Sequence, residues 1–402
     1  MVSVVISRQV IAADSRPGLA PHEFFADQPK GLGENLLASK LNYVGEVFGD
    51  VSGGVKRGAI YEGFFKLGLG LNLEKLAGWK DTVFYANVLY PHGESLTQNY
   101  VGDLNVVSNI DAYDSVRIFK FWVQQNFSQD RVSVRMGIMA ADKEFFASEG
   151  AAVLINSGFG AFPVISQDIT GPVYPVSAPG VRLQWKATNT VSFRAAVFSG
   201  DVGVPTVNRH NTRFRLRARD GASLFAEAAY KLNATGEGPP GSYKLGGFFN
   251  SKTFDDLLGG EKHHGNYGVY AIVDQRMWSE GTDEEGARQG LAAFARFAVA
   301  PEDRNVITFD SEAGLTYTGL VPRRNSDVLG VGVVYARVSR DTRGARGETF
   351  VKRRETVLEV SYQAPLNSWL TVQPDLQYIF NPGAVRAGRD AVIAGLRFSL
   401  NF

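Results

Sequence analysis

The chain has 402 residues, and its charge is nearly balanced, with 42 Lys and Arg against 41 Asp and Glu. This balance gives no global attraction to nucleic acid or to acidic lipid. Because the sequence contains no cysteine, disulfides, thiol catalysis and cysteine-ligated zinc are excluded. No run of eighteen apolar residues occurs, so the sequence predicts no membrane-spanning helix.

Residues 1–40 are expected to form an N-terminal extension, or a periplasmic or plug segment. The start, MVSVVISRQVIAADSRPG, lacks basic residues at its beginning, and its apolar stretch is too short for a convincing secretory signal. Two interpretations stay open here. Either the printed sequence begins after a removed signal, or the protein stays inside the cell.

From about Leu41 to the last residue, apolar and polar side chains alternate in short segments separated by turn residues. The alternation is clear in RVSVRMGI (131–138), GVRLQWKA (180–187), LEVSYQ (358–363) and LTVQPDLQYI (370–379). A period of two places apolar side chains on one face of a strand and polar side chains on the other. The pattern therefore predicts an all-β chain, although a soluble β-sandwich or adhesin would show similar alternation.

Three features favour a transmembrane barrel over a sandwich. The polar faces carry arginines, acids and glutamines along whole strands, and aromatic residues such as Trp369 and Tyr378 lie near strand ends, as in membrane-interface girdles. The chain also ends inside an amphipathic strand, VIAGLRFSLNF (392–402). About seventeen candidate strands are present, but bacterial single-chain barrels have even numbers. We therefore expect residues 41–402 to form a transmembrane antiparallel up-and-down β-barrel of about 16 strands (range roughly 16–18) with a water-filled lumen.

A long loop is expected around residues 142–178, where the alternation is lost. Its central part, AAVLINSGFGAFPVI (151–165), is apolar but has no period of two. The segment is interpreted as a long loop that contains a helical turn. Whether it folds into the lumen or packs on the surface stays open.

The stretch RFRLRAR (213–219) has an arginine at every second position. As a strand, it would present four guanidinium groups on one face. One arginine at the lipid-facing midplane of a barrel costs about 2–4 kcal/mol, so this face is predicted to line the lumen. A three-residue turn at 220–222 would place Arg215 opposite Glu227 and partly neutralise the arginines. In an alternative interpretation, the arginines lie above the membrane, where water solvates them and they have no functional role.

Alternate positions along predicted strands face the same side, and this rule gives further inward-facing candidates. They lie around the hairpin at Thr188 and Asn189, and in YGVYAIVDQRMW (267–278). A one-residue bulge would reverse these assignments. Fixed guanidinium groups in a lumen would donate hydrogen bonds to hydroxyls or carboxylates of a passing solute. The predicted pore-lining residues are Arg135, Arg182, Arg194, Arg213, Arg215, Arg217, Arg219, Glu227, Asp274 and Arg276.

Several motifs occur in a fixed order along the chain: YVGEVFGDVSGG (43–54), LEKLAGWKDTVFYA (73–86), RMGIMAADKEFFAS (135–148), INSGFG (155–160), and a late run from GLVPRRNSDVLGVGV (319–333) through QPDLQYIFNPG (373–383). Together they resemble the carbohydrate-selective porins, the OprB-like family of the Gram-negative outer membrane. The resemblance implies an integral outer-membrane barrel that passes glucose and related neutral sugars by diffusion. Outer-membrane lipids and small solutes are the partners it implies.

Other functions find less support in the sequence. An outer-membrane hydrolase would need an activated nucleophile, and none of the five histidines lies in a recognisable nucleophile motif. Asp142 and Glu144 lack the spacing and the glycine of an EF-hand, so a strand-end salt bridge or a turn cap is expected there. Neither a metal nor another cofactor is predicted. A general or anion-preferring porin for small polar solutes stays open, because arginines outnumber acids around residues 182–219. A single barrel and a homotrimer are both compatible with the sequence.

Overall fold

The computed structural model of the chain describes residues 35–169, 171–203, 207–214, 217–233, 238–282, 288–345, 352–386 and 388–402. Within these ranges the chain forms sixteen strands and a few short helices. The α-helical turns are α2 (Leu73–Ala77), α3 (Pro163–Ser166) and α4 (Arg340–Ala345). The strands are β1 (Leu37–Gly54), β2 (Gly58–Asn72), β3 (Thr82–Gly93), β4 (Arg117–Phe127), β5 (Val132–Met139), β6 (Ala178–Lys186), β7 (Val191–Ser199), β8 (Ala222–Leu232), β9 (Gly241–Phe254), β10 (His263–Thr282), β11 (Arg288–Val299), β12 (Ile307–Thr318), β13 (Val328–Val338), β14 (Arg354–Pro365), β15 (Leu370–Phe380) and β16 (Arg389–Asn401).

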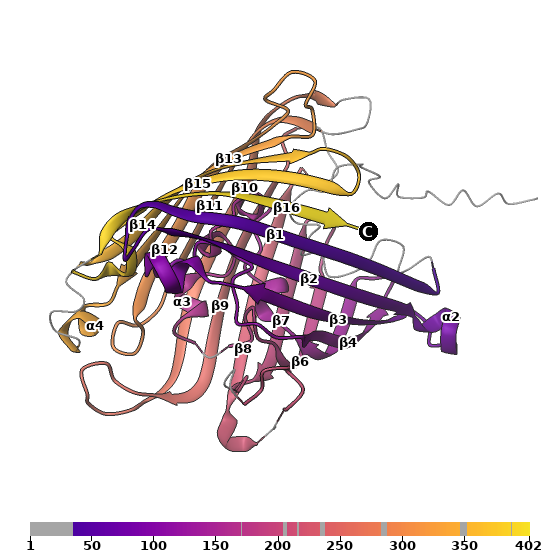
Figure 1. Cartoon of the computed structure of the whole chain (residues 1–402). Coiled ribbons are helices and arrows are strands. Elements are labelled where there is room, and N and C mark those ends of the chain that lie inside the picture. Colours follow the sequence, from indigo (N-terminus) through magenta and orange to yellow (C-terminus); the bar gives the residue numbers. More distant parts are fainter. Residues whose placement is uncertain are drawn as a thin grey trace, which may run out of the picture.

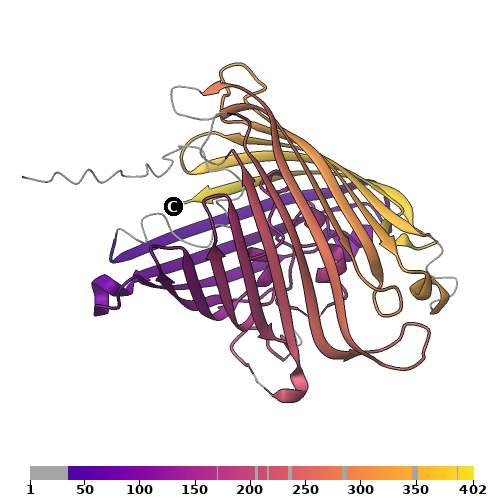
Figure 2. The same cartoon turned by 180° about the vertical axis from the view of Figure 1, so that it is seen from behind.

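Each strand pairs antiparallel with its neighbours in chain order, and β1 closes the barrel by pairing with β16 (Figure 1). At the closing seam, Glu46 lies opposite Arg397 on β16, and the register shifts further along β1, between Asp50 and Gly54. On its other side, Glu46 lies opposite Glu62 on β2. The strands run obliquely around the barrel, as the view from behind shows (Figure 2). The prediction of an antiparallel up-and-down barrel of about sixteen strands is confirmed.

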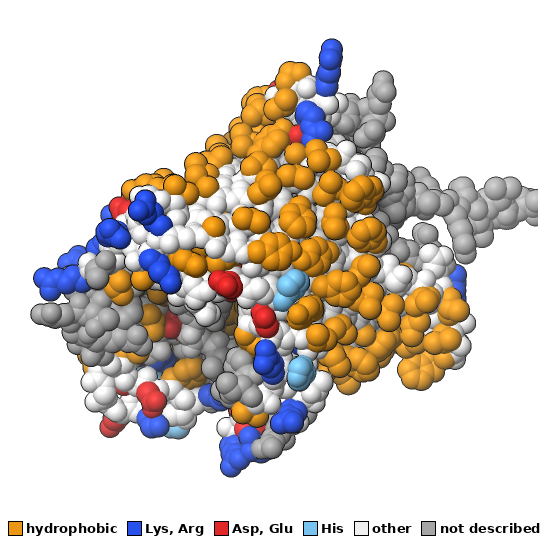
Figure 3. All heavy atoms as spheres, viewed as in Figure 1, with side chains coloured by type: hydrophobic (Ala, Val, Ile, Leu, Met, Phe, Trp, Pro, Cys, Tyr) orange, Lys and Arg blue, Asp and Glu red, His pale blue; other side chains and the backbone are white. Residues whose placement is uncertain are grey.

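The two faces of the wall have opposite chemistry. Apolar side chains such as Leu183, Val331 and Leu358 are exposed on the outside, whereas charged side chains such as Arg135 and Glu359 are buried inside. Apolar side chains form a broad band on the outer surface (Figure 3). A water-soluble sandwich would place these faces the other way round, so the wall fits a lipid environment outside. Within the described ranges, no helix has the length and apolar character needed to cross a membrane.

The two ends of the barrel differ in the length of their connections. The end that carries the start of β1 and the end of β16 has short turns, such as residues 128–131 and 366–369. The opposite end has the long connections, which span residues 94–116, 140–177 and 200–221. Outer-membrane barrels have short periplasmic turns and longer extracellular loops. The long connections therefore belong to the extracellular end.

Candidate functional site

The connection between β5 and β6 folds into the barrel. It comprises residues 140–169 and 171–177, here called the inner segment. Its side chains Phe145 and Phe146 are buried against inward-facing rings of the wall, with ring centroids 5.6 Å apart for Phe145 and Phe225 and 5.2 Å apart for Phe146 and Tyr270. The apolar sequence of the segment has no period of two because the segment contacts the wall as a folded loop. Of the two interpretations left open by the sequence, the structure shows the luminal one.

Two glycines on β13 allow the inner segment to approach the wall closely. A Cβ atom at Gly332 would lie 2.4 Å from Cδ1 of Leu154 and 2.6 Å from the ring of Phe159. A Cβ atom at Gly330 would lie 3.0 Å from Cγ1 of Val153. Glycine at these positions therefore makes room for the apolar side of the segment.

Carboxylates on one part of the wall hold the backbone of the inner segment. Glu359 on β14 accepts hydrogen bonds from the backbone N–H groups of Ile155 (2.5 Å) and Asn156 (2.9 Å). Asp310 on β12 accepts one from the N–H of Val164 at 2.7 Å. These carboxylates satisfy buried backbone donors that would otherwise lose their hydrogen bonds to water. We call the inward-facing carboxylates of β12, β14 and β15 the acidic wall; they are Asp310, Glu312, Glu355, Glu359 and Asp375.

The acidic wall also holds a second inner connection, residues 94–116 between β3 and β4. Glu355 accepts hydrogen bonds from the backbone N–H groups of Leu104 and Asn105, both at 2.7 Å. The side-chain amide of Asn156 then joins the two connections, because it donates to the carbonyl of Asn105 at 2.9 Å and to Gln377 of β15 at 3.0 Å. Both connections are therefore fixed to the same side of the barrel.

One buried arginine complements these carboxylates. Arg296 on β11 is fully buried and donates to the backbone carbonyls of Phe159 and Gly160, both at 2.7 Å. Its guanidinium carbon lies 4.3 Å from the ring centroid of Phe162. The wall thus binds both the donors and the acceptors of the segment's backbone.

A cationic region lies on the inner surface of β4 to β7. We call Lys120, Arg135, Arg182 and Arg194 the basic wall. The inner segment inserts Glu144 here: Glu144 pairs with Arg135, accepts a hydrogen bond from Nε of Arg182 at 3.0 Å, and its backbone carbonyl accepts one from Arg194. Burial acts to raise the pKa of Glu144, but the charges of the three arginines together hold it below its ordinary value of 4.5.

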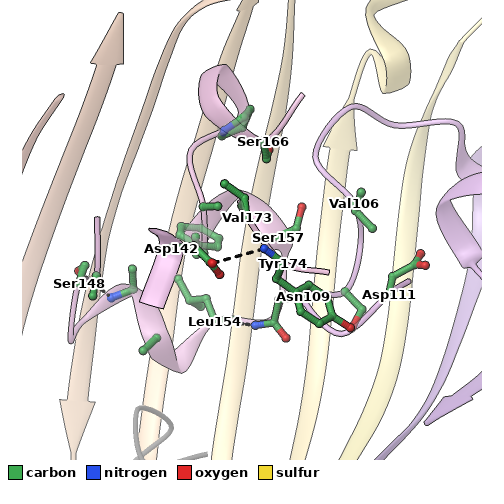
Figure 4. Close-up of a pocket in the computed structure, with 18 of the residues that line it drawn as sticks. Val106, Asn109, Asp111, Asp142, Ser148, Leu154, Ser157, Ser166, Val173 and Tyr174 are labelled. Atoms are coloured by element: carbon green, nitrogen blue, oxygen red, sulfur yellow. Dashed lines mark hydrogen bonds between the residues drawn. The ribbon is translucent and has the colours of Figure 1, made fainter. Parts of the chain in front are cut away.

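A cavity of about 550 Å³ remains between the two inner connections. Polar groups of Asp111, Asp142, Ser148 and Asn109 surround it together with apolar side chains such as Leu154, and these residues come from both connections (Figure 4). Lys143 also lines the cavity and lies 3.1 Å from Asp142. The lining therefore offers hydrogen-bond donors, acceptors and apolar surface to one small molecule.

Several predicted pathway residues face the barrel interior. Arg135, Arg182 and Arg194 surround Glu144, and Glu227 lies across the strand pair from Arg194, with 4.0 Å between Nη1 and Oε1. Asp274 accepts hydrogen bonds from the hydroxyl of Ser148 (2.5 Å) and the N–H of Gly150 (3.0 Å). Arg276 follows Asp274 at the same parity along β10, beside a bulge. That these side chains line the solute path stays a prediction.

The predicted arginine strand over residues 213–219 is wrong for its described members. Arg213, Arg217 and Arg219 are exposed in the connection between β7 and β8, and Arg217 pairs with Asp220 at 3.1 Å. Arg215 lies outside the described residues. The register of β7 with β8 agrees with this result. Glu227 lies opposite Arg194 on β7 and not opposite Arg215, as the predicted turn required.

The physical reason is the pairing of β7 with β8. These strands pair directly from Val191 and Tyr230 to Ser199 and Ala222, so the sheet has no open edge between them for another strand. The connection instead lies against the first residues of β4, where the carbonyl of His210 accepts a hydrogen bond from the N–H of Ile118 at 3.2 Å. Alternation over seven residues shows only that a segment could form an amphipathic strand. It does not show whether a neighbouring strand has a free edge with which the segment could pair.

Sequence reasoning selected some of the residues that hold the inner segment, namely Arg135, Arg182 and Asp274, and missed others. Glu359, Asp310 and Arg296 lie on strands whose alternation is readable, so parity could place them inside the barrel. Their partners are backbone atoms of a distant segment. Every residue has such backbone atoms, so the sequence does not indicate which of them a side chain will bind. For Glu144 the sequence favoured a strand-end salt bridge or turn cap over metal binding but named no partner; in the structure its partners are Arg135 and Arg182.

A closed sixteen-stranded barrel, apolar outside and charged inside, with a connection folded into its lumen, defines an outer-membrane porin. The family model described as "Carbohydrate-selective porin, OprB family" matches residues 56–402. The chain belongs to this family. It is therefore an integral barrel of the Gram-negative outer membrane, in a family of channels.

Curated relatives agree with this assignment. The chain is 25% identical to Porin B of Pseudomonas aeruginosa over 425 aligned positions, which cover 90% of this chain and 87% of the relative. It is 24% identical to the putative porin QuiX of Acinetobacter baylyi over 370 positions, covering 85% and 83% of the two chains.

Solved structures show the same fold. A high-pH structure of Pseudomonas putida OprB is similar with a TM-score of 0.83 at 23% identity, over 94% of this chain and all of that one. A low-pH structure of the same protein gives a TM-score of 0.60 at 21% identity, over 91% and 92% of the two chains.

Proposed function

We propose that this chain is a passive channel for glucose-sized neutral sugars, which pass through the cavity beside the inner segment. The observation that carries this proposal is the cavity of about 550 Å³ between the two inner connections. Small-molecule sites typically have volumes of roughly 300–1,000 Å³, so a monosaccharide fits while the segment restricts larger solutes. Membership of the family supports sugars as the solute class.

The lining supports weak binding at several points. Asp111, Asp142 and Lys143 offer charged hydrogen-bond partners to hydroxyls, and Leu154 and Val106 offer apolar contacts to the less polar faces of a sugar ring. A channel needs contacts that are favourable enough for entry and weak enough for release. No catalytic step is part of the proposal.

Liposome swelling with sugars of increasing size tests the proposal. We expect glucose to enter rapidly and the rate to fall steeply for disaccharides and longer oligosaccharides. Uptake of glucose no faster than in protein-free liposomes would refute it.

Arg194 is the predicted pathway residue whose substitution can be matched with a control. Its side chain is 30% exposed inside the barrel, next to Glu227. We expect Arg194→Gln to change the glucose rate by about two- to fivefold, since one charge-assisted hydrogen bond is lost at a partly solvated site. Arg217→Gln, which removes the same charge from the exposed connection, should leave the rate unchanged.

An anion-preferring channel is the second candidate. It is favoured by the basic wall, where the cations Lys120, Arg135, Arg182 and Arg194 outnumber the carboxylates that pair with them, Glu144 and Glu227. Reversal potentials in planar bilayers under a salt gradient separate the two candidates. Strong anion selectivity without any block of the current by glucose would favour the second one.

A further inference from the structure

The extracellular rim carries an uneven distribution of charge. The extracellular end of the β13–β14 hairpin is basic. Arg337 on β13, Arg354 on β14, and Arg340 and Arg353 in their connection are all exposed, and the side chain of Arg340 is 79% exposed. Lys and Arg side chains gather at this corner of the surface, around α4 (Figure 3). By contrast, the connection of residues 255–262 carries Asp255, Asp256 and Glu261 against a single lysine. We call the four arginines the basic rim.

Two arginines of the basic rim are placed against each other by the sheet register. Arg337 on β13 lies directly opposite Arg354 on β14. Like charges in directly opposed positions destabilise a strand pair. Each of the two charges is therefore favoured by an anion nearby, and Glu302 supplies one for Arg337.

The basic rim borders the apolar band on the outer surface. The guanidinium carbon of Arg337 lies 6.0 Å from the ring centroid of Phe309, and that of Arg354 lies 5.8 Å from the ring centroid of Tyr335. The centroids of these two rings lie 6.1 Å apart, and the outer face of β13 continues towards the membrane with exposed Val331, four residues before Tyr335. Aromatic residues in this position mark the membrane–water interface, so the arginines lie at the level of lipid headgroups.

The chain itself compensates only part of this charge. Glu302, on the neighbouring connection, lies 3.3 Å from Nη2 of Arg337 and 3.9 Å from Nε of Arg340. The other carboxylates nearby in the sequence are Asp341 on α4, Glu348, and Glu355, whose side chain binds the inner connection at Asn105. No ion pair of Arg353 or Arg354 occurs among the described residues.

We propose that the basic rim binds the phosphate groups of a phosphorylated glycolipid of the outer leaflet, of the lipid A type. Guanidinium groups bind phosphate through paired, charge-assisted hydrogen bonds, and basic clusters beside a membrane-spanning segment bind anionic headgroups. The arginines lie on the outer surface beside the apolar band, where the acyl chains of the same lipid would cover Phe309, Tyr335 and Val331. A soluble anion would use the guanidinium groups alone and gain nothing from this apolar surface.

Binding of purified lipid A tests the proposal by native mass spectrometry of the full chain in detergent. The variant Arg337→Gln/Arg353→Gln/Arg354→Gln should bind bis-phosphorylated lipid A at least tenfold more weakly than the wild type. The wild type should bind dephosphorylated lipid A no better than the variant does. Equal affinity of the wild type and the variant for bis-phosphorylated lipid A would overturn the proposal.

A matched control removes three exposed charges from the opposite, periplasmic end: Lys80→Gln/Arg131→Gln/Lys186→Gln. This variant should keep wild-type affinity, and an equal loss in both variants would show general electrostatics and refute the site. Phosphatidylglycerol and inorganic phosphate serve as competitors. If millimolar inorganic phosphate displaces lipid A, the basic rim is a site for soluble anions, and the proposal that it binds a glycolipid is refuted. Heat-modifiable migration in gel electrophoresis verifies that each variant retains a folded barrel.

Discussion

The acidic wall and the basic wall hold the same inner segment through opposite arrangements. On the acidic wall, Glu359 and Asp310 accept hydrogen bonds from backbone N–H groups, so they recognise the path of the segment and not its side chains. On the basic wall, Arg135 and Arg182 bind one particular side chain, Glu144. The segment's sequence therefore matters most at Glu144, whereas its backbone conformation matters most along β12 to β14.

The difference also shows where excess charge remains. On the acidic wall, Glu359, Glu355 and Asp310 accept hydrogen bonds from backbone N–H groups, and Arg296 lies 3.7 Å from Glu312. The basic wall has four cations, whereas two carboxylates, Glu144 and Glu227, pair with its arginines. We expect the interior to be cationic on the side of β4 to β7. Substitutions on the two walls should therefore differ in their effects on stability and on conductance.

The largest effect is expected from Glu144→Gln. Removing one partner of a buried ion pair leaves Arg135 and Arg182 buried without an anion, which destabilises by about 3–5 kcal/mol. We expect a clearly lower thermal midpoint and a higher single-channel conductance, because the segment is released from the basic wall. Glu149→Gln, an exposed residue of the same segment, is the control, and similar behaviour of the two variants would contradict the comparison.

A smaller loss is expected from Glu359→Gln on the acidic wall. The amide keeps one acceptor oxygen for the two N–H donors of Ile155 and Asn156, so one buried donor becomes unsatisfied, at about 1–3 kcal/mol. Liposome swelling should then admit larger sugars than the wild-type channel does. Glu261→Gln at the rim controls for the loss of charge. An unchanged size limit would show that this carboxylate does not fix the segment.

Gly332→Ala should act through shape alone. The added Cβ would lie 2.4 Å from Leu154, and overpacking of this kind destabilises by roughly 1–3 kcal/mol. We expect the segment to shift from the wall and the conductance to change modestly, while the barrel stays folded. Conductance and melting temperature that both match the wild type would contradict the close packing.

The smallest effect is a pH dependence that arises on the basic wall. The pKa of Glu144 in the folded protein is lowered from its ordinary value of 4.5, so its stabilising contribution is complete above that value. It is lost as the pH falls through the lower, folded-state pKa. We expect the gap in melting temperature between the wild type and Glu144→Gln to shrink below about pH 4.5. A gap that widens on acidification would contradict the assigned sign.

Sequence reasoning predicted the barrel because each strand repeats a local pattern of period two, which records the lipid on one side and the lumen on the other. It placed Arg135, Arg182 and Arg194 inside the barrel for the same reason. It was wrong about residues 213–219, since the availability of a sheet edge depends on the pairing of β7 with β8. It also missed Glu359 and Arg296 as anchors, because their partners are backbone atoms more than a hundred residues away.

The central claim is that the inner segment lies in the solute path. The chain contains no cysteine, so Ser157→Cys, which lines the cavity, creates a single reactive thiol. Adding a charged methanethiosulfonate reagent to this variant in a planar bilayer should reduce the single-channel current in discrete steps, while Leu358→Cys on the outer face should give no change. An undiminished current after verified labelling of Ser157→Cys would contradict the account.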